Sequence, residues 1–198
     1  MEKAKGSQNA IDTDQVFKDS LKSQYHAALS MLREGVEICS EEMWFNAKHE
    51  NAKHENALWQ IAYHTLFFTH LYLQPNEQAF RPWEQHQESV QHPDGFLGPA
   101  DPNSTLPLIP KPYTRGQVLE YWRICDAMVD SCIDRLDLRA PADGFSWKKN
   151  VVPTVEFQIG NIRHLQHGVA QLATRLRREA GRGIQWVGSG RYQTQSAG

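Results

Sequence analysis

The chain has 198 residues, is 40% hydrophobic, and carries 21 lysines and arginines against 23 acidic residues, a formal net charge of -2. This length and apolar content suit one sizeable domain. The near balance of charge, with no long run of either sign, argues against nucleic acid and acidic membranes as partners. Three cysteines without a CxxC pair argue against a disulfide framework or a cysteine zinc site, and they indicate a reducing cytoplasm.

The chain is expected to have three parts: a disordered lead over residues 1–10, one helical domain over residues 11–188 and a flexible tail over residues 189–198. The start of the sequence is too polar for the apolar core of a secretory signal. The most apolar stretch, residues 58–73, falls short of the roughly 20 residues that span a bilayer, and polar residues interrupt it. We therefore expect no membrane partner.

Two helices are expected before the middle of the chain. The first follows Asp12, which with Gln15 three residues on makes a capping start, and apolar residues then recur at helical spacing. The second runs over residues 56–73 and stops before Pro75, because the residue that precedes a proline avoids the α region. The lead-in to this second helix repeats the unit NAKHE, which we interpret as a duplication in a solvated helical segment. His49 and His54 would not share a face of such a helix, so they are not a ligand pair.

A proline-rich segment follows the second helix. Residues 74–113 hold eight prolines, which indicates a long ordered loop or lid, with a short helix expected near Trp83 to Val90. A third helix is expected from Thr114, in a capping box with Gln117, to about Leu138. Together with a fourth helix this pattern predicts an all-α four-helix bundle with a long proline-rich crossover between its second and third helices.

The fourth helix is expected over residues 155–179, with Thr154 as its cap and Gly181 as its stop. Its apolar residues form one stripe that faces the core, with His164 to one side of the stripe and His167 nearly opposite. His167 should therefore meet solvent. The residues of the stripe are Ile162, Leu165, Val169, Leu172 and Leu176.

His64 shares an apolar face of the second helix with Ile61, Phe68 and Leu71, so its imidazole should point inward and needs a partner. That partner is either a backbone or side-chain acceptor, the usual case for a lone buried histidine, or a metal ion. His70 lies on another face, and we interpret it as structural or exposed.

Four motifs in order resemble the DinB-like superfamily of four-helix-bundle metalloenzymes: WQIAYH, KPYTRGQVLEYW, NIRHLQHGVAQL and GIQWVG. The resemblance covers about residues 12–188. It implies a divalent transition metal such as nickel or zinc, held by one histidine of the second helix and two of the fourth with HxxxH spacing. His64 matches the first ligand and His164 the second. The resemblance also implies a homodimer.

The third ligand position of that family falls on Gly168. Its neighbour His167 is turned by about 100° away from the face of His164 and could replace the ligand only through a local distortion. Glycine lowers helix stability by about 1 kcal/mol relative to alanine, so its presence at position 168 indicates a need for space, either for a close helix contact or for a ligand. Drift after loss of the metal would give the same residue. Water, or a carboxylate such as Glu120 or Asp126, is the other way to complete the site.

The remaining side chains with reactive or binding chemistry are better interpreted as structural. Aromatic residues that could line a small pocket are more often core and lid packing, and cysteines within an apolar helical stripe are more often core. Arginines at the end of the fourth helix are stabilised by its dipole without an anionic partner. The aromatic residues are Tyr63, Trp83, Tyr113 and Trp122. The cysteines are Cys125 and Cys132, and the arginines are Arg175, Arg177, Arg178 and Arg182.

Two functions from different classes are therefore expected. The first is a DinB-like metal-dependent enzyme that acts on a small molecule, of thiol-transferase or hydrolase type, with an incomplete histidine triad. The second is a metal-free bundle that serves as a homodimer or small-ligand-binding protein and has lost catalysis. The sequence carries no substrate signature, and no nucleotide-binding or serine-nucleophile motif.

Overall fold

The computed structural model describes residues 12–46, 48–50, 53–88, 90–92, 111–146 and 150–190. The part of the chain that the structure describes is helical apart from two short paired strands. In chain order the described elements are α1 (Thr13–Ile38), α2 (Glu41–Phe45), β1 (Lys48–Glu50), β2 (Lys53–Glu55), α3 (Leu58–Tyr72), the 3-10 helix η1 (Glu77–Ala79), α4 (Arg115–Arg135) and α5 (Thr154–Ala180).

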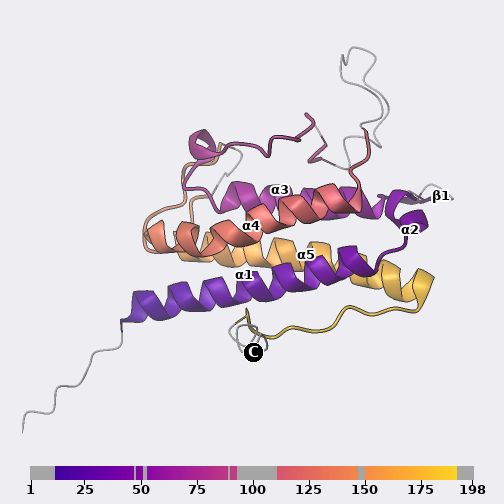
Figure 1. Ribbon diagram of the computed structural model, residues 1–198. Coiled ribbons are helices and arrows are strands. Elements are labelled where there is room, and N and C mark those ends of the chain that lie inside the picture. Colours follow the sequence, from indigo (N-terminus) through magenta and orange to yellow (C-terminus); the bar gives the residue numbers. More distant parts are fainter. Residues whose placement is uncertain are drawn as a thin grey trace, which may run out of the picture.

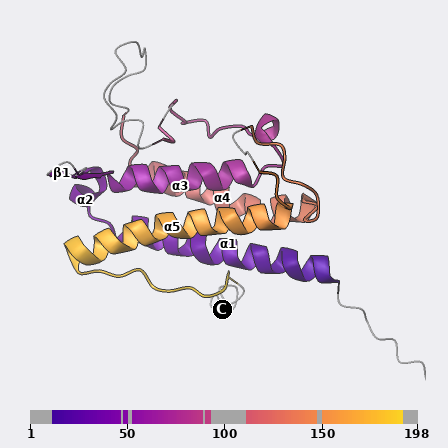
Figure 2. The same cartoon turned by 180° about the vertical axis from the view of Figure 1, so that it is seen from behind.

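The four long helices lie side by side (Figures 1 and 2). α1 packs on α4 and α5, and α3 packs on the same two helices. Each long helix therefore contributes an apolar stripe to a shared core, as the helical periodicity of the sequence predicts. On α5 the stripe residues Leu165, Val169, Leu172 and Leu176 are buried. None of the described helices has both the length and the apolar content needed to cross a membrane.

The helix boundaries follow the local signals in the sequence. Asp12 caps α1 by accepting from the backbone N–H of Asp14 and Gln15, and Thr114 and Gln117 form the expected capping box at the start of α4. α5 ends at Gly181, whose φ of 63° lies in the left-handed region that glycine adopts without strain. These predictions are confirmed, although α4 ends at Arg135 rather than near Leu138.

Two local predictions are wrong. The N-cap of α5 is Pro153, and the hydroxyl of Thr154 instead donates to the backbone carbonyl of Ala140, 2.9 Å away. The described residues between Trp83 and Val90 form turns rather than a helix, and the helical turn among the described residues of this segment is η1, further upstream. In the case of Thr154, a contact with a distant segment replaces the local pattern.

The NAKHE repeat forms a hairpin, so its interpretation as a helical lead-in is wrong. β1 and β2 pair antiparallel, with His49 opposite His54. The register also sets Lys48 opposite Glu55 and Glu50 opposite Lys53. The duplication therefore supplies two short strands that match each other.

Arg175 of α5 ties the two ends of this hairpin segment to the helix. Its guanidinium is buried and donates to the backbone carbonyls of Asn56 and Asn46, while its Nε donates to Glu179 at 3.2 Å. Arg175 therefore has a specific structural role in addition to the favourable position of a cation near the end of a helix. The guanidinium therefore satisfies these two carbonyls and fixes the junction between α2, the hairpin and α3.

Some sequence predictions lie outside the described residues. These are the disordered lead over residues 1–10, residues 93–110 of the proline-rich segment and residues 191–198 of the tail. Ser189, which is described, lies beside α1, with its Oγ 2.7 Å from the Oγ of Ser23.

Candidate functional site

His64 of α3 and His164 of α5 meet between the two helices. Their Nε2 atoms are 3.1 Å apart, and the ring centroids are separated by 5.0 Å. Both side chains are partly buried. The two residues are 100 positions apart in the chain, so only the packing of α3 on α5 brings them together. We call them the histidine pair below.

The backbone fixes the proton of His64. Its Nδ1 lies 2.6 Å from the carbonyl oxygen of Gln91, which can only accept, so Nδ1 carries the hydrogen and donates. The Nε2 of His64 therefore presents a lone pair toward His164 in the neutral ring. The sequence had left the partner of His64 open, and the structure supplies a backbone acceptor from the loop after α3.

His164 is neutral at neutral pH. Burial, reinforced by the nearby His64 and His167, lowers the pKa of His164 to about 4. Its Nδ1 is buried and has no hydrogen-bond partner among the residues that the structure describes. The two rings therefore differ: the outer nitrogen of His64 is bound to Gln91, whereas that of the neutral His164 is not.

Gly168 is in close contact with α3 and does not mark a vacant position. A Cβ built on Gly168 would lie 2.0 Å from the Oγ1 and 2.9 Å from the Cγ2 of Thr65. Thr65 is fully buried, and its hydroxyl donates to the carbonyl of Ile61 at 2.7 Å, so it has little freedom to move. The sequence left open whether Gly168 makes space for a close helix contact or for a ligand, or reflects drift. The structure shows a close contact between two helices at this position. A histidine side chain does not fit there unless α3 and α5 move apart.

His167 lies on the outer face of α5, as the sequence predicts. It is exposed, and its Nε2 accepts from the Nε2 of Gln171 at 2.7 Å. It borders a separate pocket that is also lined by Asn56 and Arg178. The described part of α5 is regular at this point, so the distortion needed to bring His167 to His164 does not occur.

The two carboxylates considered as a third ligand lie elsewhere. Asp126 contacts His26 of α1, and Glu120 accepts from the side-chain amide of Gln85 at 3.2 Å. Within the described ranges, no group of three or more histidine, cysteine, aspartate or glutamate side chains is arranged to hold a metal ion. The histidine pair is thus a site of two protein nitrogens.

His70 has a structural role. It is buried, and its Nδ1 lies 3.1 Å from the hydroxyl of Tyr121. Burial lowers the pKa of His70 to about 4, so the ring is neutral at neutral pH.

A buried aromatic cluster holds the loop that reaches His64. Tyr63 stacks on Tyr113 with ring centroids 4.6 Å apart, and its hydroxyl lies 2.6 Å from the Nδ1 of His86. Trp83 stacks on Tyr121 at 4.9 Å. These contacts anchor residues 83–88 over α3 and so position the carbonyl of Gln91. Sequence reasoning missed Gln91 because the acceptor is a backbone atom, which no side-chain pattern marks.

The two cysteines are core residues, as the sequence predicts, whereas one of the four aromatic residues lies away from the other three. Cys125 and Cys132 are free and buried in the core, and burial raises the pKa of both thiols. Trp122 lies apart from the aromatic cluster: its indole N–H donates to the carbonyl of Leu29 at 2.7 Å, and Arg33 lies over its ring.

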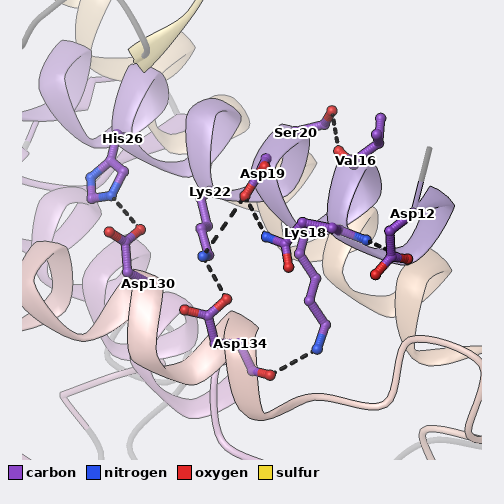
Figure 3. A network of polar contacts seen from close by, with 10 residues as sticks. Asp12, Val16, Lys18, Asp19, Ser20, Lys22, His26, Asp130 and Asp134 are labelled. Carbon is purple, nitrogen blue, oxygen red and sulfur yellow. Dashed lines mark hydrogen bonds and ion pairs between the residues drawn. The ribbon is translucent and has the colours of Figure 1, made fainter. Parts of the chain in front are cut away.

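A second histidine cluster between α1 and α4 was not predicted. The Nδ1 of His26 lies 2.7 Å from a carboxylate oxygen of Asp126, and its Nε2 lies 3.1 Å from one of Asp130. Figure 3 shows His26 beside Asp130, and Lys22 between Asp19 and Asp134 on the same two helices. The spacing of Asp126 and Asp130 marks one face of α4, but nothing in the sequence indicates that His26 faces it. Because the two ring nitrogens of His26 contact different carboxylates, the cluster is a set of ion pairs rather than a metal site.

We compared the chain with protein-family models, with curated proteins and with solved structures, and none of these searches found a match. A functional interpretation therefore rests on the residues and on their geometry.

Proposed function

We propose that the chain is a DinB-like four-helix bundle. In this proposal α1, α3, α4 and α5 form the bundle, and the proline-rich segment between α3 and α4 is its crossover. The pairing of α1 and α3 each with α4 and α5 supports it, as does the order of the four sequence motifs along the chain.

The proposed activity is that of a metal-dependent enzyme acting on a small molecule, of thiol-transferase or hydrolase type. His64 and His164 would hold a divalent transition metal such as nickel or zinc. One observation carries this proposal: the two Nε2 atoms are 3.1 Å apart. Two imidazoles that share one ion at metal–nitrogen distances of about 2.0 to 2.1 Å have their nitrogens about 2.9 to 3.4 Å apart. The donor set therefore fits, although it has only two members.

The residues around the pair prepare both nitrogens for this role. The carbonyl of Gln91 holds the hydrogen of His64 on Nδ1, which leaves Nε2 as the donor atom and orients the ring, as the partners of metal-bound histidines do. The lowered pKa of His164 keeps that ring unprotonated at neutral pH. A bound divalent metal would supply Lewis acidity, which lowers the pKa of a water or a thiol. The contact of Gly168 with Thr65 leaves the remaining positions to water or substrate.

A second function is favoured by that same contact. Thr65 fills the space beside Gly168, where the third histidine of the resemblance would lie, and the Nδ1 of His164 has no partner among the described residues, which leaves the outer hydrogen bonding of the pair incomplete. Both features suit a metal-free homodimer or small-ligand-binding protein that has lost catalysis.

Metal analysis of protein purified without a nickel column separates the two functions. The enzyme proposal predicts close to one equivalent of transition metal after titration and dialysis, lost in His64→Ala and His164→Ala and retained in the matched variant His167→Ala. Less than about a tenth of an equivalent, with no uptake on titration, would contradict the enzyme proposal and favour the metal-free protein.

The proposal includes a homodimer in the cytoplasm. The three buried free thiols support a reducing compartment. The mass of the untagged protein in solution, measured by light scattering, tests the dimer, and a monomeric mass across the micromolar range would contradict it.

A further inference from the structure

An apolar pocket opens beside the histidine pair. Its volume is about 590 Å³, within the range of about 300 to 1,000 Å³ usual for small-molecule sites. Its walls are formed mainly by one face of α3 and by the segment that follows it, and they are predominantly apolar. The apolar and aromatic lining residues are Phe67, Phe68, Leu71, Tyr72 and Phe80.

The rings of this pocket stand at steep angles to one another. Phe67 meets Phe68 at 77° and Phe80 at 78°, with centroids 5.3 and 5.2 Å apart. Such a wall offers both faces and edges of rings, and aromatic molecules gain most from offset and edge-to-face contacts. The shape and chemistry of the lining therefore favour a flat aromatic occupant over a branched aliphatic one.

The charged groups of the pocket disfavour an anionic occupant, and the one imidazole of its lining, that of His92, is exposed to solvent. Glu77 is the acidic lining residue, and its carboxylate already accepts from the backbone N–H and the hydroxyl of Ser146, at 2.7 and 2.9 Å. No arginine or lysine is among the lining residues of this pocket. Burial of an unpaired carboxylate or sulfonate in such a place is costly. An uncharged ligand meets no such cost.

One polar atom of the lining needs a donor. Gln91 contributes to the pocket, and its side-chain Oε1 is buried with no hydrogen-bond partner among the described residues. A buried acceptor without a donor is unfavourable, so a ligand that brings an O–H or N–H group gains a hydrogen bond there. The backbone carbonyl of the same residue is the acceptor of His64.

The pocket and the histidine pair share a wall. Phe68 lies 4.8 Å from His64 and 5.6 Å from His164 between ring centroids, and Tyr72 lies 6.5 Å from His164. Neither histidine lines the pocket, so a molecule held against Phe68 is separated from the two imidazoles by the thickness of that one ring.

We propose that this pocket binds the ring of a small, uncharged aromatic molecule that donates a hydrogen bond to the Oε1 of Gln91, and holds it beside His64 and His164. As a statement of substrate class this inference rests on the proposed function, whereas the pocket itself can be tested without metal.

The test uses the uncharged fluorophore N-phenyl-1-naphthylamine with the full-length protein. We expect saturable binding of one molecule per chain. Phe80→Ala should weaken this binding about fivefold through loss of ring contacts. The matched control Phe17→Ala removes an exposed phenylalanine of α1, far from the pocket in sequence and fold, and should leave binding unchanged. Absence of saturable binding, or equal loss in both variants, would overturn the proposal.

Displacement of the fluorophore from the unmodified protein tests the ligand chemistry without a variant that must fold. 1-Naphthol should displace it about fivefold more strongly than 1-methoxynaphthalene, which lacks the donor. 1-Naphthoate, an anion of similar size, should be at least about tenfold weaker. Gln91→Leu should abolish the preference for 1-naphthol while it retains the backbone carbonyl. Equal displacement by all three compounds would overturn the assignment of the ligand class.

The two proposals fail in different ways. His167→Ala and Phe80→Ala should retain metal uptake, and His64→Ala should lose metal uptake while it still binds the fluorophore. Fluorophore binding without metal uptake would contradict the enzyme proposal alone, and metal uptake without fluorophore binding would contradict the pocket alone.

Discussion

Two pairs of helices in this protein carry histidines in opposite environments. Between α1 and α4, His26 lies between Asp126 and Asp130, and hydrogen bonds to these carboxylates raise its pKa despite partial burial. Between α3 and α5, His164 meets His64 and aromatic rings without an acidic partner, and burial lowers its pKa to about 4. The same kind of side chain thus has a raised pKa at one interface and a lowered pKa at the other.

The difference shows what each interface is suited to. A histidine between two carboxylates gains stability from its proton and has both nitrogens occupied, so it ties α1 to α4. Between α3 and α5 the Nε2 atoms of His64 and His164 instead face each other, and the Nδ1 of His164 has no partner among the described residues. The following predictions test this contrast, starting with the interface that has the least room.

Gly168→Ala should produce the largest loss of stability. The added methyl group meets buried Thr65 at 2.0 Å, and we expect the free energy of unfolding to fall by about 3 kcal/mol, measured by urea denaturation at pH 7.5. Gly160→Ala on the same helix is the matched control. Nothing lies within 4 Å of its added Cβ, so it should gain about 0.5 to 1 kcal/mol from helix propensity.

The double variant Thr65→Ala/Gly168→Ala sharpens this prediction. Removal of Oγ1 and Cγ2 relieves the two shortest contacts, so about half of the lost stability should return. If Gly168→Ala is as stable as the original chain, the close contact between α3 and α5 is wrong.

His70→Phe should change the pH dependence of stability by about 2 kcal/mol. The folded pKa of His70, about 4, lies below its ordinary value of 6.5, so the unfolded chain takes up the proton first as the pH falls. Stability from this group is present above pH 6.5 and is lost toward pH 4. Between pH 7.5 and 5 the variant should therefore lose about 2 kcal/mol less than the original chain in urea denaturation. Identical pH profiles would show that His70 is not held neutral by burial.

His26→Asn should have the smallest effect and the opposite pH dependence. The folded pKa of His26 is raised, so its contribution is fully present below pH 6.5 and disappears as the pH rises through the folded pKa. We expect a loss of about 1 kcal/mol at pH 6 and a smaller loss at pH 9. His167→Asn, an exposed histidine of α5, is the control and should change stability by less than about 0.5 kcal/mol at either pH. An equal loss at both pH values would show that the ion pairs of His26 contribute nothing.

Much of the helical framework could be predicted from neighbouring residues. Asp12, the capping box of Thr114 with Gln117, and Gly181 mark ends that depend on hydrogen bonds within one turn. Thr154 shows where this reasoning stops, because its hydroxyl bonds a carbonyl 14 residues away instead of its own helix. The hairpin was missed for a similar reason: pairing across a duplicated segment outweighs the helical pattern.

The candidate site was only partly predictable. The inward face of His64 and the outward face of His167 follow from helical periodicity, which depends on the residue itself and its near neighbours. Three features depend on elements that are distant in the chain, and no local pattern carries that information. They are the contact made by the carbonyl of Gln91, the unpartnered acceptor of its side chain and the position of His26.

Local sequence was enough to specify the helical class of the protein, most of its helix ends and the faces on which its histidines lie, because caps and periodicity act over one or two turns. Three contacts came instead from the packing of helices distant in the chain: His64 meets His164 at 3.1 Å, Thr65 fills the space beside Gly168, and His26 lies between two carboxylates. Those contacts depend on how closely two helices approach and on which faces they present to each other. That depends on the fit of all the buried side chains at once.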